Sequence, residues 1–246
     1  MSLFGRSRGV RFVEAETILR GLMAKRVERP GVREGYDRWS HTYDATPNPL
    51  VALDRRHTLA ALEPRAGEAV LDAGCGTGAH LAGLSASRAR AVGLDFSRGM
   101  LRVAQQRAPR AALAQADLNA EFPIRPGAFD ALLSSLVSEH LRDLRRFFAE
   151  AYAALRRGGR LVFSAFHPHL ALAGIEANFE QGGTEYRLGA QPYTVDDYLN
   201  GIADAGFERL ECREYLGDES LVADVPAAAK YLGKPLLLLI RAERAA

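Results

Sequence analysis

The chain has 246 residues, of which 48% are hydrophobic and 25% charged, and its formal net charge is +2. This composition is typical of a soluble globular protein, and so small a net charge gives no bulk field of the kind that marks a nucleic-acid or membrane binder. Only two cysteines occur, Cys75 and Cys212, so we expect no disulfide framework and a cytoplasmic location. The apolar run 235–240 is too short to span a bilayer, the N-terminus has no apolar signal-peptide core, and no metal site is expected.

The first part of the chain is predicted to be helical. Helices are expected in three pieces over residues 11–62, with breaks at 28–31 and 45–49, where proline and glycine stop helices. We therefore expect residues 1–62 to form a helical N-terminal extension, and residues 63–246 to form one domain.

From residue 70 onward, short apolar runs alternate with helix-like segments. This alternation is typical of crossover units in a parallel sheet with helices on both faces. Gly158 is expected to end the helix before the fifth strand as a left-handed C-cap. The expected strands are 70–73, 90–94, 112–115, 129–134 and 160–165, and the expected helices are near 79–87, 98–107 and 141–156.

The last third of the chain breaks this rhythm. Residues 167–192 are expected to form an insert after the fifth strand, at the rim of the ligand site, where loops usually set specificity. A helix is expected over 194–205 with Thr194 as its N-cap, followed by two final strands at 206–215 and 234–243.

The segment VLDAGCGTG, residues 70–78, is an apolar strand that runs into a glycine-rich turn. Its three glycines stand at alternate positions, whereas the dinucleotide fingerprint places its third glycine one residue later, so an NAD-dependent oxidoreductase is disfavoured. Asp72 precedes the first glycine by two residues, and a carboxylate there suits an ammonium group or sugar hydroxyls better than a phosphate. Asp95 ends the next strand 23 residues later, close to the ~20-residue spacing at which an acid meets ribose hydroxyls.

Five motifs in order resemble those of class I S-adenosylmethionine-dependent methyltransferases. They are VLDAGCGTG, GLDFS with a following Met, QADLNAEFP, FDALLSSLVSEHL and LRRGGRLVFSAF. Within that superfamily the chain is most similar to the small-molecule branch, which includes quinone-biosynthesis and malonyl-carrier-protein methyltransferases. The resemblance implies a Rossmann-like doubly wound α/β sheet, mostly parallel with an antiparallel last strand, and S-adenosyl-L-methionine as the cofactor.

The resemblance also implies how residues contact this cofactor. The glycine turn would surround its methionine part, Asp72 would lie near its amino group, and Asp95 would bind its ribose diol. Two implied adenine contacts have structural alternatives, since Met100 could be core and Asp117 could cap its own turn. The implied cofactor-binding residues are Tyr36, Tyr43, Asp72, Gly74, Cys75, Gly76, Asp95, Phe96, Met100, Asp117, Leu118 and Ser135.

An aromatic stripe precedes the glycine turn. Tyr36, Trp39 and Tyr43 share one helical face, which most often means packing against the core. Aromatic faces also attract a sulfonium cation, and related enzymes use this segment as a lid. We expect Tyr36 and Tyr43 to belong to a lid and Trp39 to pack.

Two histidines are the predicted catalytic residues. His140 and His167 follow the neighbouring fourth and fifth strands, and a neutral imidazole suits a general base if the nucleophile arrives protonated. The alternatives are that His140 caps a helix and that His167 shapes the turn before Pro168. Arg187, in the insert, would either hold an anionic substrate group or pair with a nearby acid.

The predicted function is methyl transfer from S-adenosylmethionine to a small-molecule acceptor, through oxygen, carbon or nitrogen, by in-line displacement. Two alternatives stay open, namely methylation of an acyl group bound to a carrier protein, and a non-catalytic regulatory protein that only binds the cofactor. Neither a nucleic-acid nor a membrane partner is expected, because the amino-methyltransferase signature and a basic stripe with interleaved aromatics are both absent from the sequence. The sequence does not fix the oligomeric state.

Overall fold

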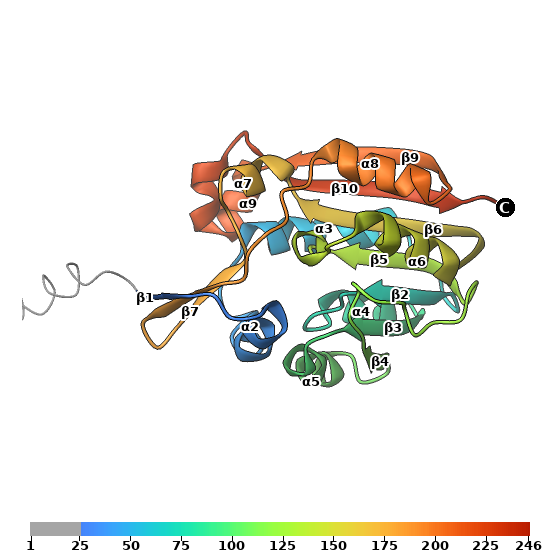
Figure 1. The fold of residues 1–246 in the computed structure, drawn as a ribbon, viewed down its shortest axis with the longest axis horizontal. Coiled ribbons are helices and arrows are strands. Elements are labelled where there is room, and N and C mark those ends of the chain that lie inside the picture. Colours follow the sequence, from blue (N-terminus) through green and yellow to red (C-terminus); the bar gives the residue numbers. More distant parts are fainter. Residues whose placement is uncertain (1–25) are drawn as a thin grey trace, which may run out of the picture.

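The computed structural model describes residues 26–246, so the helical piece expected before residue 26 lies outside the described residues. Within them is a seven-stranded sheet of order β4-β3-β2-β5-β6-β10-β9 (Figure 1). The first five of these strands are parallel neighbours, while β10 is antiparallel to both β6 and β9, which confirms the predicted mostly parallel sheet with an antiparallel last strand. The strands are β2 (Ala69–Ala73), β3 (Arg90–Asp95), β4 (Ala112–Gln115), β5 (Phe129–Ser135), β6 (Leu155–Phe166), β9 (Phe207–Leu216) and β10 (Pro235–Arg244).

Helices cover both faces of this sheet because its strands are apolar on both sides. Adjacent residues of β2 show this, since Val70 joins one buried cluster and Leu71 the other. The first cluster includes residues of α3 (Pro49–Leu62), α4 (Ala79–Ala86) and α5 (Arg98–Arg107), and the second includes residues of α6 (Leu144–Ala154) and α8 (Val195–Asp204).

Two helix starts follow the sequence closely. Asn48 is the N-cap of α3, and its side chain accepts a hydrogen bond from the Leu50 N–H at 2.9 Å. Thr194 and Asp197 form a reciprocal capping box at the start of α8, as expected for a threonine N-cap. The connector 216–233 contains α9 (Glu219–Asp224) and the 3-10 helix η2 (Pro226–Tyr231).

The predicted role of Gly158 as the C-cap of the helix before the fifth strand is wrong. It has the left-handed conformation, with φ 69°, but α6 has already ended at Ala154, four residues earlier. The helix stops there because Leu155 is extended, fully buried and paired with Phe129 of β5, so sheet pairing ends the helix before the glycine is reached.

The insert forms a second sheet. After the short helix α7 (Pro168–Leu172), strands β7 (Asn178–Gln181) and β8 (Thr184–Arg187) make an antiparallel hairpin. The chain before α2 (Val32–Trp39) adds β1 (Arg26–Glu28), which pairs parallel with β8, so residues 26–27 are strand and not the predicted helix. Figure 1 shows this small sheet next to α2, at one end of the molecule. Within the described part of the chain, no helix combines the length and the apolar character needed to cross a membrane.

Candidate active site

Two cavities lie side by side at the carboxyl ends of the central strands, where ligands bind in open α/β sheets. The smaller one, of about 90 Å³, adjoins the glycine turn, and the larger one, of about 480 Å³, lies between the start of α3 and the insert. Tyr36, Tyr43 and Leu136 line both cavities, so they form the wall between them.

The structure brings most of the predicted residues to the smaller cavity. They come from α2, the glycine turn, and the segments that follow β3, β4 and β5. The predicted residues that line it are Tyr36, Tyr43, Gly74, Gly76, Asp95, Phe96, Met100, Asp117, Leu118, Ser135 and His140.

The glycine turn owes its shape to left-handed backbone. Gly74, Gly76 and Gly78 have φ of 90°, 50° and 79°, a region that side chains with a Cβ rarely adopt. A Cβ on Gly74 would lie 2.3 Å from Val137, whereas one on Gly76 would meet no atom within 4 Å. Because Gly76 also lines the smaller cavity, its missing side chain leaves room for a ligand there.

Asp95 is held in place by backbone donors. The Gly76 N–H donates to Oδ2 at 2.9 Å, and the Ser97 N–H donates to Oδ1 at 2.8 Å. Burial raises the pKa of Asp95 to about 6, and these backbone hydrogen bonds act in the opposite direction. Asp95 is therefore ionised at neutral pH and can accept further hydrogen bonds from ligand hydroxyls.

Asp72 and Cys75 do not belong to the lining of the smaller cavity. Cys75 packs into the core under the turn. Asp72 is 1% exposed, and neither of its carboxylate oxygens has a hydrogen-bond partner among residues 26–246. Burial raises the pKa of Asp72 to about 7. A buried carboxyl group without a partner is costly, so this one is available to a ligand cation or an intervening water.

Asp117 and Met100 each have a structural contact and also line the smaller cavity, so the structure shows both features that the sequence had offered as alternatives. Asp117 accepts the Asn119 N–H at 2.9 Å, which closes the turn, and it also lines the smaller cavity. Met100 is 2% exposed and packed, yet it contributes to the same lining.

The aromatic stripe connects the cofactor side to the insert. Tyr36 stacks on Trp39, with ring centroids 5.8 Å apart, and Trp39 stacks in turn on Phe179 of β7 at 5.1 Å. The packing role expected for Trp39 is therefore present, although Trp39 also lines the larger cavity. Asp37 fixes α2 on α5, because its carboxylate accepts hydrogen bonds from the Ser97 hydroxyl and the Gly99 N–H.

His140 lies in the 3-10 helix η1 (Ser138–His140) and lines the smaller cavity. Its Nε2 shares a hydrogen bond of 3.0 Å with the Tyr36 hydroxyl. Burial lowers the pKa of His140 to about 4, so the imidazole is neutral at pH 7 but weakly basic.

His167 lies in neither cavity lining, so the structure does not bring it to His140. Its side chain accepts the His169 N–H at the start of α7, and its Nε2 lies 3.3 Å from a carboxylate oxygen of Glu214. This is the turn-shaping role that the sequence left as an alternative. Arg187 likewise pairs with acids, with its Nε 2.8 Å from Glu185 and its Nη1 3.8 Å from Glu176.

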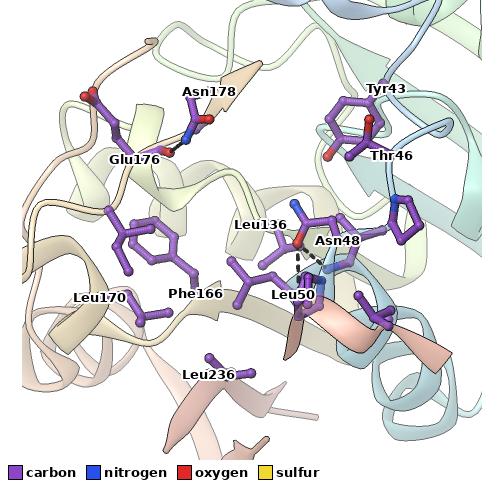
Figure 2. A pocket seen from close by; sticks show the side chains of 18 of the residues that line it. Tyr43, Thr46, Asn48, Leu50, Leu136, Phe166, Leu170, Glu176, Asn178 and Leu236 are labelled. Atoms are coloured by element: carbon purple, nitrogen blue, oxygen red, sulfur yellow. Dashed lines mark hydrogen bonds between the residues drawn. The ribbon is translucent and has the colours of Figure 1, made fainter. Parts of the chain in front are cut away.

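The larger cavity is mainly apolar and was not predicted residue by residue. Leucine and phenylalanine side chains from α3, β6, α7 and β10 surround it, and Figure 2 shows them opposite Glu176 and Asn178 of the insert. The family resemblance implied that Leu136 lies beside the methionine part of the cofactor, and Leu136 lines both cavities, whereas the sequence assigned no role to Glu139, which lines only the larger one. Leu136 has φ 51°, a strained value for a leucine, at the point where the chain turns between the two cavities.

Comparisons with known proteins match this geometry. A family model described as a methyltransferase domain matches residues 71–163. A demethylmenaquinone methyltransferase of Streptomyces avermitilis is 31% identical over 163 residues, which are 64% of this chain and 67% of that protein. The chain belongs to the family of class I S-adenosylmethionine-dependent methyltransferases.

Other relatives carry related names. A demethylmenaquinone methyltransferase of Clavibacter sepedonicus is 35% identical over 148 residues, covering 56% of this chain and 60% of that protein. A malonyl-[acyl-carrier protein] O-methyltransferase of Serratia marcescens is 34% identical over 141 residues, covering 56% and 53%. The chain thus spans less than two thirds of the length of these two relatives.

A solved structure of an S-adenosylmethionine-dependent methyltransferase from Mesorhizobium loti has a TM-score of 0.67 and 25% identity, and the match covers 80% of this chain and all of that one. S-Adenosylmethionine is the cofactor of the family. The residues at the smaller cavity of this chain suit that cofactor, because an ionised carboxylate lines the cavity, an unpartnered carboxyl lies behind the glycine turn, and Gly76 carries no side chain that would fill the space.

Proposed function

We propose that the protein transfers the methyl group of S-adenosylmethionine to a small-molecule acceptor. The cofactor would occupy the smaller cavity and the acceptor the larger one. The observation that carries this proposal is the shared wall of Tyr36, Tyr43 and Leu136 between the two cavities. Methyl transfer chiefly requires that the two reactants be held in line, and adjacent cavities separated by only these side chains suit that requirement.

Each side of the smaller cavity would have its own task. Asp95 would accept hydrogen bonds from the ribose diol, and Asp72 would lie towards the amino group of the methionine part. Phe96 and Met100 would flank the adenine. When bound, S-adenosylmethionine supplies a methyl group on a sulfonium, which a nucleophile attacks in line.

The segment around α2 would act as a lid over the cofactor. The Tyr36 hydroxyl bonds to His140, and both residues line the smaller cavity, so opening of this contact would widen the path for the cofactor. Among the described residues of the extension predicted for 1–62, α3 instead contacts β6 and β10, so α2 and the turn after it are the candidates for movement.

A carrier-bound acyl group is the second candidate acceptor. The Serratia marcescens relative favours it by its name. A free small molecule is the better fit, because apolar side chains from four elements line much of the larger cavity. We also propose a cytoplasmic location, which the two free cysteines support.

The proposal is tested first by binding. Calorimetric titration with S-adenosylmethionine and S-adenosylhomocysteine, beside NADH, should give binding of the first two ligands alone. The Asp95→Ala variant should lose this binding, while Asp196→Ala, which removes an exposed carboxylate on α8, should keep it. Binding would justify an acceptor screen that records release of S-adenosylhomocysteine. Cofactor binding without any turnover would favour the non-catalytic alternative, and preference for NADH would refute the proposal.

A further inference from the structure

Glu139 contributes to the larger cavity a buried carboxyl group with one unpartnered oxygen. The residue is 8% exposed and lines that cavity, and its Oε2 is buried without a hydrogen-bond partner in the described residues. Its backbone is fixed, since its carbonyl accepts the Gln191 N–H at 2.9 Å. A carboxyl group buried in this way is expensive unless a ligand completes its hydrogen bonds.

Among residues 26–246, no cation pairs with this carboxyl group. Its titratable neighbours are the phenols of Tyr36, Tyr43 and Tyr198, all of which sense its charge, and the imidazole of His140. The Nε2 of His140 lies 3.9 Å from Oε1, beyond hydrogen-bonding distance, and is already bonded to Tyr36.

The other charged groups of the larger cavity are engaged or exposed. Asp44 is paired with Arg55 at 2.6 Å, and Glu176 is paired with Arg29 at 2.9 Å. Lys230 is exposed to solvent. Glu139 is therefore the buried acid of this lining that no cation neutralises.

We propose that Glu139 takes the proton of the methyl acceptor, and that the acceptor is an apolar molecule whose nucleophile is an O–H or N–H group. This inference rests on the proposed function. The acceptor heteroatom forms a bond to the methyl carbon, the carbon–sulfur bond breaks with its electron pair left on sulfur, and the proton passes from the heteroatom to Oε2 of Glu139.

The surroundings of Glu139 match both halves of this proposal. Figure 2 shows apolar side chains, among them Leu50, Phe166, Leu170 and Leu236, gathered around the space that would hold the body of the acceptor. Burial raises the pKa of Glu139 to about 8, which makes its carboxylate a stronger base than an ordinary glutamate at the pH where it ionises. His140, the base predicted from sequence, is less suited because its pKa is low and its Nε2 is occupied.

The same geometry disfavours an anionic acceptor such as a free carboxylate. A second negative charge beside Glu139 would repel its carboxylate, because Arg55 of the cavity lining is already paired with Asp44 and Lys230 is exposed to solvent. The acceptor that we propose therefore does not carry a carboxylate, such as that of a malonyl group, as its nucleophile.

Binding of simple probes tests the charge preference without turnover. Trp39 is the only tryptophan of the chain and lines the larger cavity, so its fluorescence reports occupancy. The probes are 3-phenylpropan-1-ol, 3-phenylpropylamine and 3-phenylpropanoate, which share one apolar body and differ only in the head group. Titrations run from pH 6.5 to pH 9.5.

Between these two pH values the dissociation constant of 3-phenylpropanoate should rise at least tenfold, with a midpoint near pH 8. That of the alcohol should stay constant within threefold, and the amine should bind more tightly at the higher pH. The Glu139→Gln variant should lose the pH dependence of the carboxylate and amine probes, and its affinity for the alcohol should again stay constant. The matched control Glu208→Gln, which changes an exposed carboxylate at the amino-terminal end of β9, should keep the trends of the wild type.

Equal affinity of the carboxylate probe at both pH values in the wild type would overturn the proposal, and this result does not depend on any variant folding. Persistence of the trends in Glu139→Gln would overturn it as well. In turnover, Glu139→Gln should lower kcat by ~10²–10⁴-fold while KM changes less than threefold, and an unchanged kcat would refute the proton role. Failure of the wild type to bind S-adenosylmethionine would instead refute the proposed function, while the probe titrations would still report on Glu139.

Discussion

Two glycines of the same turn should respond very differently to replacement by alanine. Gly76 and Gly78 both have left-handed backbone, with φ of 50° and 79°, so alanine costs ~1–2 kcal/mol of strain at either position. A Cβ on Gly78 would lie 2.9 Å from the Ala104 Cα of α5, which adds an overpacking cost of ~1–3 kcal/mol. A Cβ on Gly76 would meet no protein atom within 4 Å.

Gly76→Ala should therefore lower the free energy of unfolding by only ~1–2 kcal/mol, and Gly78→Ala by ~2–5 kcal/mol. For a chain of this size, 1 kcal/mol corresponds to about 2–4 °C in Tm. Cofactor affinity should show the opposite order. The new methyl group of Gly76→Ala would occupy the smaller cavity and weaken S-adenosylmethionine binding at least tenfold, or ~1.4 kcal/mol, whereas folded Gly78→Ala should bind nearly normally.

Differential scanning calorimetry and isothermal titration measure the two effects independently. The Gly76 N–H that holds Asp95 survives in the alanine variant, so a loss of affinity would reflect lost space and not a lost hydrogen bond. If Gly76→Ala binds the cofactor as the wild type does, the smaller cavity is not the cofactor site.

Three further predictions concern titratable groups. Because the pKa of Asp95 is about 6, affinity for S-adenosylmethionine should fall about tenfold between pH 7.5 and pH 5, as measured by calorimetric titration, and a flat profile would contradict its role. Asp54→Ala should lower the free energy of unfolding by ~3–5 kcal/mol, because it leaves the buried His80 without its partner at 2.6 Å. Asp54 raises the pKa of His80 in the folded state. The wild type should therefore exceed Asp54→Ala in free energy of unfolding by most below pH 6.5, the usual pKa of histidine, and this difference should shrink as the pH rises through the pKa of His80 in the folded state. Chemical unfolding measures the difference, and a difference that grows with pH would refute this reasoning. Tyr36→Phe should lower the free energy of unfolding by ~0.5–1.5 kcal/mol, because it removes the hydrogen bond to His140. If α2 is a lid, the rate of S-adenosylhomocysteine release, measured by stopped flow, should rise several-fold in this variant.

The central sheet could be predicted from sequence because the patterns that indicate it are local. Strand–helix alternation, the glycine turn and the helix caps all depend on residues close together in the chain. For the same reason α5 was predicted at its observed bounds, residues 98–107, and strand β4 at 112–115. The positions of Gly74, Gly76 and Asp95 around one cavity follow from the turn and from the pairing of two neighbouring parallel strands.

Contacts between distant segments were decided only by tertiary structure. Residues 26–28 form a strand because they pair with β8, more than 150 residues away, and no local pattern shows that. Gly158 does not cap the preceding helix, because the buried Leu155 pairs with Phe129 of β5 and the helix ends before it.

The residues that face the acceptor cavity were decided in the same way. His140 and His167 look equivalent in sequence, since each follows a strand end, but only His140 reaches a cavity. Glu139 stands beside His140 in the chain, and only the packing of α2, the insert and η1 buries its carboxyl group and leaves Oε2 without a partner among the described residues. The sequence by itself determined the family, the sheet and which residues gather at the smaller cavity, where each signal is short. Burial and charge pairing are properties of surroundings drawn from distant parts of the chain, and therefore the lining of the larger cavity emerged only from the folded structure.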